Sequence, residues 1–176
     1  MMITYQTLQR DQVNKLLEID RSEYIDFIYE LRNQHLMEVQ SGHECPTWTE
    51  EMMGEIQQRF LYEMDNGGMA IGAFDGQMLI GFGVLAHKFR GKDLNKLQVD
   101  LMYVSRNYRR QGIGTRIFNL LSEEARIRGA KSLYISSTET RSAVFFYKSN
   151  GSKLTSEIDD ELFNKEPKDI HMVVDL

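Results

Sequence analysis

The chain has 176 residues, 41% of them hydrophobic and 27% charged, which are ordinary values for a single globular domain spanning residues 1–176. The formal net charge of −5 argues against general nucleic-acid binding. A single cysteine, Cys45, excludes an intramolecular disulfide, and the sequence has neither an apolar run of membrane-spanning length nor a signal-peptide core. We therefore expect a cytoplasmic protein that binds neither membrane nor nucleic acid.

The first part of the chain is predicted to be mainly helical. Residues 2–8 alternate apolar and polar side chains, which predicts an edge strand, and Asp11 is placed to cap a short helix after it. The bulky residues that begin at Tyr24 predict a longer helix over 23–40. Residues 41–46 combine glycine, proline and polar side chains and are predicted to form a loop.

The next segment has the pattern of a helix followed by a β-hairpin. Thr47 and Glu50 have the spacing of a capping box, so a helix is predicted to run to about residue 65. Strands are predicted at 69–74 and 77–86, because the dipeptide Asp75-Gly76 between them is typical of a type I′ turn.

The second half of the chain alternates strands and helices. The predicted segments are a central strand at 97–103, a glycine turn at 109–114, a helix ending near 127, a strand at 132–136, a helix at 141–149, a strand near 152–158, an acidic loop at 159–161 and a final strand near 170–175. The fold class is therefore α/β, with a mixed central sheet of about six to seven strands flanked by helices.

The turn Arg109-Arg110-Gln111-Gly112-Ile113-Gly114 is the most informative stretch of the sequence. A strand that enters a glycine turn and then a helix brings unpaired backbone N–H groups and the positive end of the helix dipole to one place, which attracts phosphate. The glycines permit backbone angles that other residues avoid, and the arginines add forked donors suited to a pyrophosphate. The pattern predicts an anion site for a phosphorylated cofactor.

Two other phosphate-binding loops fit this turn less well. A P-loop requires Gly-Lys-Ser/Thr at its end, whereas Gly114 is followed by Thr115 and Arg116. A dinucleotide-binding turn requires a third glycine where Ile117 stands. A nucleotide-binding α/β protein of either kind is an alternative class, and tighter binding of NAD or ATP than of coenzyme A would distinguish it.

Arg109-x-x-Gly112-x-Gly114 resembles the Arg/Gln-x-x-Gly-x-Gly/Ala signature of the GNAT family of N-acetyltransferases. Further along, Ala143-x-x-x-Tyr147-x-x-x-Gly151 is similar to the second signature of that family. The two motifs have the family's order and spacing, and the resemblance covers about residues 67–155. Residues 20–23 and 166–172 are similar to segments of bacterial members.

The resemblance implies that acetyl-coenzyme A is the cosubstrate. No metal is expected, because His35, His43, Cys45 and His87 do not have the spacing of a metal site. Backbone amides of the turn would hold the pyrophosphate, and main-chain groups of the preceding strand would pair with the pantetheine arm and point an N–H at the acetyl carbonyl. Thr140 stands where many relatives have an asparagine that contacts the cofactor. The implied cofactor residues are Met102, Tyr103, Val104, Arg109, Arg110, Gln111, Gly112, Ile113, Gly114, Thr115 and Thr140.

By resemblance, Tyr147 occupies the position of the general acid that protonates the departing thiolate. A phenol with a pKa of about 10 can give its proton to a thiolate whose acid has a pKa of about 8.5 with a modest uphill step. The family's glutamate base falls at Gln98, so Asp100, two residues on, is the candidate base, with a water or desolvation of the amine as alternatives. Because Cys45 lies in a predicted loop far from both motifs, we expect direct attack by the amine in a ternary complex.

The resemblance implies that the first helices and the last strands wall the acceptor pocket, which makes Glu23, Trp48 and His171 candidate acceptor contacts. His171 is also a candidate base through its near-neutral pKa. The resemblance implies a small-molecule or peptide amine as partner and admits a homodimer, because many relatives dimerise. The predicted function is acetyl transfer from acetyl-coenzyme A to a primary amine. The alternative is a sensor that binds acetyl-coenzyme A without transferring it, which the departures at Gln98 and Thr140 keep open.

Overall fold

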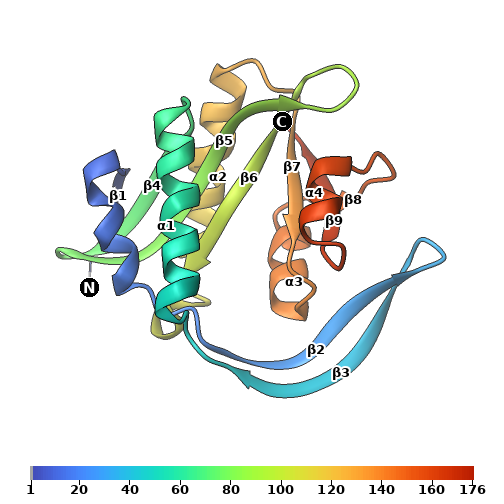
Figure 1. Cartoon of the computed structure of the whole chain (residues 1–176), viewed down its shortest axis with the longest axis horizontal. Helices are drawn as coiled ribbons and strands as arrows, with labels where there is room; N and C mark the ends of the chain where they lie inside the picture. The colour runs from blue at the N-terminus through green and yellow to red at the C-terminus, as the bar shows by residue number, and fades with distance from the viewer. Residues whose placement is uncertain (1) are drawn as a thin grey trace.

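The computed structural model describes residues 2–176 and contains a seven-stranded mixed sheet and a separate two-stranded ribbon (Figure 1). The strand order of the sheet is β1-β4-β5-β6-β7-β9-β8, and the ribbon pairs β2 with β3. The elements are β1 (Ile3–Thr7), the 3₁₀ helix η1 (Arg10–Glu18), β2 (Glu23–Arg32), β3 (His35–Cys45), α1 (Glu50–Asp65), β4 (Met69–Asp75), β5 (Met78–Arg90), β6 (Lys96–Val104), the 3₁₀ turn η2 (Arg106–Tyr108), α2 (Ile113–Ile127), β7 (Ser132–Ser137), α3 (Arg141–Ser149), β8 (Lys153–Leu154), α4 (Asp160–Lys165) and β9 (Ile170–Asp175). The predicted α/β class with a mixed sheet is confirmed.

Helices cover both faces of the sheet. On one face, η1 and α1 bury Leu16 and Phe60 against the β5 residue Phe82. On the other, α2 buries Ile117 and Leu121 against strands β4 to β7. Figure 1 shows α1 and α2 on opposite sides of β4 and β5. The helix α2 approaches β5 closely because Gly83 has no side chain: a Cβ there would lie 2.8 Å from Cγ2 of Ile117.

The helix predicted over 23–40 is wrong, because this segment forms the ribbon of β2 and β3. Arg32 pairs with His35, so Asn33 and Gln34 are the two central residues of the turn, and both have positive φ, as a type I′ turn requires. Bulky β-branched and aromatic residues, typical of strands, fill β2. The loop predicted at 41–46 is also wrong for most of its length, since β3 continues to Cys45.

The ribbon curves along one end of the sheet and lies against the start of α3 (Figure 1). The backbone N–H of Tyr29 donates to the carbonyl of Glu139 at 2.7 Å. The guanidinium of Arg141 forms ion pairs with Asp26 of β2 and Glu38 of β3. These contacts hold the ribbon against the segment that leads from β7 into α3.

Four predicted local features need correction. The acidic segment 159–161 starts the helix α4, because the Asp159 side chain accepts the N–H of Leu162 at 3.0 Å and caps it. The caps of α1 and η1 are Thr49 and Gln9 rather than Thr47 and Asp11.

The hairpin between β4 and β5 is confirmed, but its central residues are Gly76, at φ +60°, and Gln77, which is the type II′ arrangement. The strands also differ in extent, since β5 continues to Arg90 and β8 is limited to Lys153–Leu154.

None of the helices in residues 2–176 combines the length and the apolar character needed to cross a membrane.

Candidate functional site

The strands β6 and β7 separate partway along β6. Their parallel ladder runs from Lys96 to Gln98 of β6 and no further within residues 2–176. On its other edge β6 stays paired with β5 as far as Val104, but this pairing skips Asp100, whose neighbours on both sides have partners. Asp100 is therefore the extra residue of a β-bulge, which bends a strand and interrupts its ladder. The result is an opening between β6 and β7, called the split below, along which one backbone edge of β6 lacks a neighbouring strand.

The bulge also changes which way the β6 side chains face. Before the bulge, Leu97 and Val99 pack on the face of the sheet that α2 covers. After it, Leu101 and Tyr103 pack on the opposite face, which α1 covers. The ring of Tyr103 meets the edge of Trp48 at a centroid distance of 4.7 Å. The bulge therefore directs Tyr103 to the side of the sheet where the ribbon and α1 meet.

Arg59 of α1 holds the bulge in place. Its Nη2 donates to both the carbonyl oxygen and Oδ1 of Asp100, each at 2.9 Å. The carboxylate predicted to be the general base is thus half of an ion pair, with 14% of its side chain exposed. Sequence reasoning missed Arg59, because a guanidinium on a helix does not reveal which carboxylate, 41 residues away, it contacts.

The predicted phosphate turn lies at the end of the split, where α2 begins. Gly112 is the N-cap of α2 and has φ +80°, a left-handed conformation that disfavours a Cβ. As a glycine it provides no side-chain cap, so the first N–H groups of α2 face outward without intrahelical partners. Gly114 has a different role: a Cβ there would lie 3.1 Å from the ring of Phe146, so this glycine allows α2 and α3 to pack together.

The side chains around the turn divide between core and surface. Ile113 is buried in the main core, and Met102 and Val104 pack against the same core from β6. The exposed members are Arg110, Gln111 and Thr115. Of the predicted cofactor residues, the exposed ones and the backbone of the turn are the groups that a ligand can reach.

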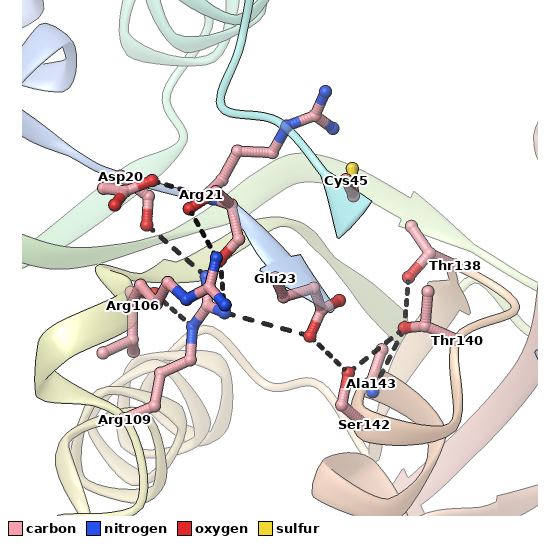
Figure 2. A network of polar contacts seen from close by, with 12 residues as sticks. Asp20, Arg21, Glu23, Cys45, Arg106, Arg109, Thr138, Thr140, Ser142 and Ala143 are labelled. Carbon is pink, nitrogen blue, oxygen red and sulfur yellow. Dashed lines mark hydrogen bonds and ion pairs between the residues drawn. The ribbon is translucent and has the colours of Figure 1, made fainter. Parts of the chain in front are cut away.

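Arg109 faces its own chain rather than solvent (Figure 2). Its Nε donates to the carbonyl of Val104 at 2.8 Å and its Nη1 to the carbonyl of Ser22 at 2.9 Å. A longer contact of 3.4 Å reaches the carbonyl of Asp20. Burial is the main cause that lowers the pKa of Arg109. Arg109 thus ties the end of β6 to the segment that leads into β2, and it positions the turn.

Glu23 connects the two sides of the split. Its carboxylate accepts a hydrogen bond from Oγ of Ser142 at 3.0 Å and lies 3.8 Å from Nη1 of Arg109 (Figure 2). Thr140 caps α3, with its hydroxyl accepting the N–H of Ala143 at 3.3 Å. The two predicted site residues Glu23 and Thr140 therefore lie in one polar network at the mouth of the split.

Substituting Gly112 tests the role of the turn. We expect Gly112→Ala to cost about 1 kcal/mol of unfolding free energy, because alanine disfavours the left-handed conformation. We also expect the Kd of coenzyme A to rise about tenfold, since a turn that leaves the left-handed conformation no longer presents the unpaired N–H groups of α2 in the same arrangement. Chemical denaturation and calorimetric titration measure the two effects.

Gly76→Ala is the matched control for this change. Gly76 also has a positive φ, +60°, and open space around its Cβ position within residues 2–176, but it lies in the hairpin between β4 and β5. It should lose similar stability and keep the same Kd. An equal loss of affinity in both variants would contradict an anion site at Gly112.

Tyr147 lies on α3, with its ring 6.0 Å from that of Phe118. Burial is the main cause that raises its pKa, and the charges of Tyr103 and Asp169 raise it further. The phenol therefore stays protonated through the neutral range and can donate its proton, and the raised pKa makes that transfer more uphill than it is for an ordinary phenol.

The other two predicted acceptor contacts differ in their surroundings. Trp48 is half-buried, packed on Tyr103, with the guanidinium of Arg21 5.6 Å from its ring centre. His171 is only 6% exposed, and its Nδ1 lies 2.5 Å from the hydroxyl of Tyr134. Burial lowers the pKa of His171, so the neutral ring is favoured. Trp48 lies beside the bulge, whereas His171 is enclosed.

Cys45 lies closer to the site than its predicted loop suggested. It is the last residue of β3 and pairs with Glu23 across the ribbon. Its thiol donates a weak hydrogen bond to the carbonyl of Pro46 at 3.6 Å. The expectation that it lies far from both motifs is wrong.

Sequence reasoning also missed Asp169, which precedes β9. Its Oδ2 accepts a hydrogen bond from Oγ of Ser136 at 2.8 Å, near the end of β7. Burial raises its pKa to about 6. The sequence shows only a carboxylate immediately before the last predicted strand. Its place beside Ser136 follows from the pairing of β9 with β7, which the sequence alone does not reveal.

Among residues 2–176, no group of three or more His, Cys, Asp or Glu side chains is arranged to hold a metal ion.

Comparison with known proteins gives one family and a consistent fold. The model of the acetyltransferase (GNAT) family matches residues 25–151. Similar solved structures include a nourseothricin acetyltransferase, at 19% identity over 99% of both chains with a TM-score of 0.75. A structure described as a streptothricin acetyltransferase of Bacillus anthracis str. Ames, in complex with acetyl coenzyme A, is 16% identical over 100% of this chain and 99% of that one, also with a TM-score of 0.75. The PaiA N-acetyltransferase of Thermoplasma acidophilum, in complex with coenzyme A, is 18% identical over 100% of both chains with a TM-score of 0.66. Comparison with curated protein sequences finds no match.

Proposed function

The chain belongs to the acetyltransferase (GNAT) family, and from that membership we propose that it transfers the acetyl group of acetyl-coenzyme A to a primary amine. The observation that carries the proposal is the split between β6 and β7, which ends at the left-handed turn of Gly112. A long cosubstrate with a pyrophosphate at one end fits an open strand edge that leads to a helix N-terminus. When bound, acetyl-coenzyme A supplies an activated thioester.

The residues of the turn fit a pyrophosphate on two counts. The N-terminal N–H groups of α2 have no intrahelical partners, and Gly112 has no side chain that could cap them. The exposed cation of Arg110 is free to approach a phosphate, whereas Arg109 holds the turn from behind. Met102 to Val104 offer the backbone groups for the pantetheine arm.

Charges near the split favour a cationic acceptor. One cavity of about 370 Å³ beside the end of β7 is lined by three acidic residues, Glu139, Glu166 and Asp169, and by one basic residue, Lys168. An amine that is protonated in solution would be attracted there before it loses its proton. The similarity to nourseothricin and streptothricin acetyltransferases supports placing these compounds first among the acceptors to be tested.

The test is thiol release from acetyl-coenzyme A in the presence of single amines. The panel contains nourseothricin, spermidine, kanamycin, lysine and a peptide with a free N-terminal alanine. We expect release with at least one of the cationic compounds and an acetylated product in its mass spectrum. Binding of coenzyme A without release for any amine would support the sensor, and absence of coenzyme A binding would overturn the proposal.

We propose direct attack by the amine in a ternary complex. Because Cys45 lies near the site, the alternative is an acetyl-enzyme on its thiol. Protein incubated with acetyl-coenzyme A alone should show no acetyl adduct at Cys45, and Cys45→Ser should retain turnover. An adduct that a subsequently added amine removes would contradict direct attack.

A further inference from the structure

Asp169 lies where the ends of β7 and β9 meet beside the split. It directly precedes β9, and its carboxylate is held by Ser136 of β7 at 2.8 Å. It is partly exposed and lines the cavity of about 370 Å³. The other residues lining that cavity are Thr138, Glu139, Glu166, Pro167 and Lys168. A carboxylate that is fixed by one hydrogen bond and opens onto a cavity has a free oxygen for a ligand.

The groups facing Asp169 come from every neighbouring element. Burial is the largest cause of its raised pKa of about 6, and Glu166 and Glu139 raise it further. The hydrogen bond from Ser136 and the cation of Arg59 act in the opposite direction. The charge of Asp169 in turn contributes to the raised pKa values of Tyr147 on α3 and Tyr103 on β6.

We propose that Asp169 is the general base that accepts the proton of the attacking amine, an inference that rests on the acetyl transfer proposed above. The position suits this role because the carboxylate opens onto a cavity and is held by Ser136, which lies on β7 beyond the last residue paired with β6 and so borders the split. At pH 7 a carboxyl group with a pKa near 6 is mainly ionised, and it remains a stronger base than an ordinary aspartate.

The acceptor first releases one proton to solvent and enters the reaction as the neutral amine, and the remaining proton transfers balance with these two groups. Asp169 takes the proton that the nitrogen loses as the C–N bond forms. Tyr147 gives its proton to sulfur as the C–S bond breaks, which yields the amide and the free thiol. The resulting carboxylic acid and phenolate then exchange that proton, directly or through a water, and both groups return to their starting states. The raised pKa of Tyr147 drives this return, because its surroundings disfavour the phenolate.

The other candidate bases are less well placed. Asp100 uses its carboxylate in the ion pair with Arg59, which fixes the bulge. His171 is enclosed, with Nδ1 against the hydroxyl of Tyr134. Gln98 has no basic group. Asp169 shares its cavity with Glu139 and Glu166, and it differs from them in being held by a hydrogen bond from a strand of the sheet.

The first test is Asp169→Asn with the acceptor identified by the amine panel. Asparagine keeps an oxygen that can accept the Ser136 hydrogen bond, so the fold should be retained. We expect kcat to fall about a hundredfold, the usual scale for loss of a general base. In the wild type, kcat/KM should rise steeply with pH up to about 6, because the base works only as the carboxylate. The slope of the pH profile should change at that point, and the variant should lose this change of slope, called the break below.

Two further variants should move the break in opposite directions while keeping the carboxylate. Ser136→Ala removes a hydrogen bond that stabilises the ionised form, so the break should move to higher pH. Glu166→Gln removes a negative charge that destabilises the ionised form, so it should move to lower pH. A merely structural role for Asp169 predicts neither shift.

A measurement without turnover separates this inference from the proposed function. In protein labelled with ¹³C at aspartate carboxyl carbons, one resonance should titrate near pH 6, vanish in Asp169→Asn and shift in the same directions in the other two variants. If no amine is acetylated while this titration is found, the proposed function fails and the base has no reaction to serve. If acetyl transfer is found but Asp169→Asn keeps its rate and its break near pH 6, the assignment of Asp169 is overturned.

Discussion

Replacing Tyr147 with phenylalanine is expected to lower kcat about a hundredfold, because a leaving thiolate then receives its proton from water instead of a positioned phenol. The Kd of acetyl-coenzyme A should stay unchanged, since the ring and its packing on Phe118 are retained. Stopped-flow or steady-state thiol release measures the rate, and calorimetry measures the affinity. Because the pKa of Tyr147 is raised, the wild-type rate should not decline between pH 7 and about 10 through loss of this proton.

The control is Tyr62→Phe, which makes the same chemical change on α1 at a ring that is 59% exposed. It should leave kcat at the wild-type value. A Tyr147→Phe variant with wild-type kcat would show that the thiolate leaves without this acid. A variant with lower affinity but unchanged kcat would place Tyr147 in cofactor binding instead.

The part of the fold that could be predicted from the sequence is the part that local patterns determine. The strand over 97–103 and the glycine at the N-cap of α2 were indicated by neighbouring residues, and the structure contains both elements. The alternation itself does not continue past Asp100, because the bulge moves Leu101 and Tyr103 to the other face of the sheet. The position of Gly112 required a left-handed backbone, which few other residues adopt, so its identity predicted its conformation.

The ribbon could not be recognised in the same way. Its residues are half-buried along most of β2, so they lack the strict alternation that distinguishes a strand from a helix. The turn is Asn33-Gln34, without the glycine that marks most type I′ turns, and nothing in the sequence interrupts the supposed helix. Pairing with β3, rather than local preference, decides the conformation.

The candidate site was predictable where it consists of backbone and less so where it consists of distant side chains. The turn at Gly112 and the helix carrying Tyr147 were found from their motifs. The bulge at Asp100 depends on pairing with β5 and on Arg59 of α1, and the placement of Asp169 depends on β9 lying beside β7. Those contacts join segments that the sequence does not relate.

Arg109→Met is expected to destabilise the protein by about 3 kcal/mol, because it removes two short hydrogen bonds from a charged donor and leaves partly buried carbonyl groups unpaired. The end of β6 would lose its connection to the segment at Ser22. We therefore also expect the Kd of coenzyme A to rise by at least about tenfold, since the turn is no longer held at the end of the split. Denaturant unfolding and calorimetric titration measure the two quantities separately.

The adjacent Arg110→Met is the matched control, because Arg110 has the same charge but an exposed side chain. Its unfolding free energy should change by less than about 0.5 kcal/mol, as is usual for surface positions. Its affinity for coenzyme A should fall at low salt and approach the wild-type value at high salt, since an exposed cation acts on a phosphate through a screened field. Equal stability losses in the two variants would contradict the positioning role of Arg109, and an unchanged, salt-independent affinity in Arg110→Met would contradict a phosphate beside this turn.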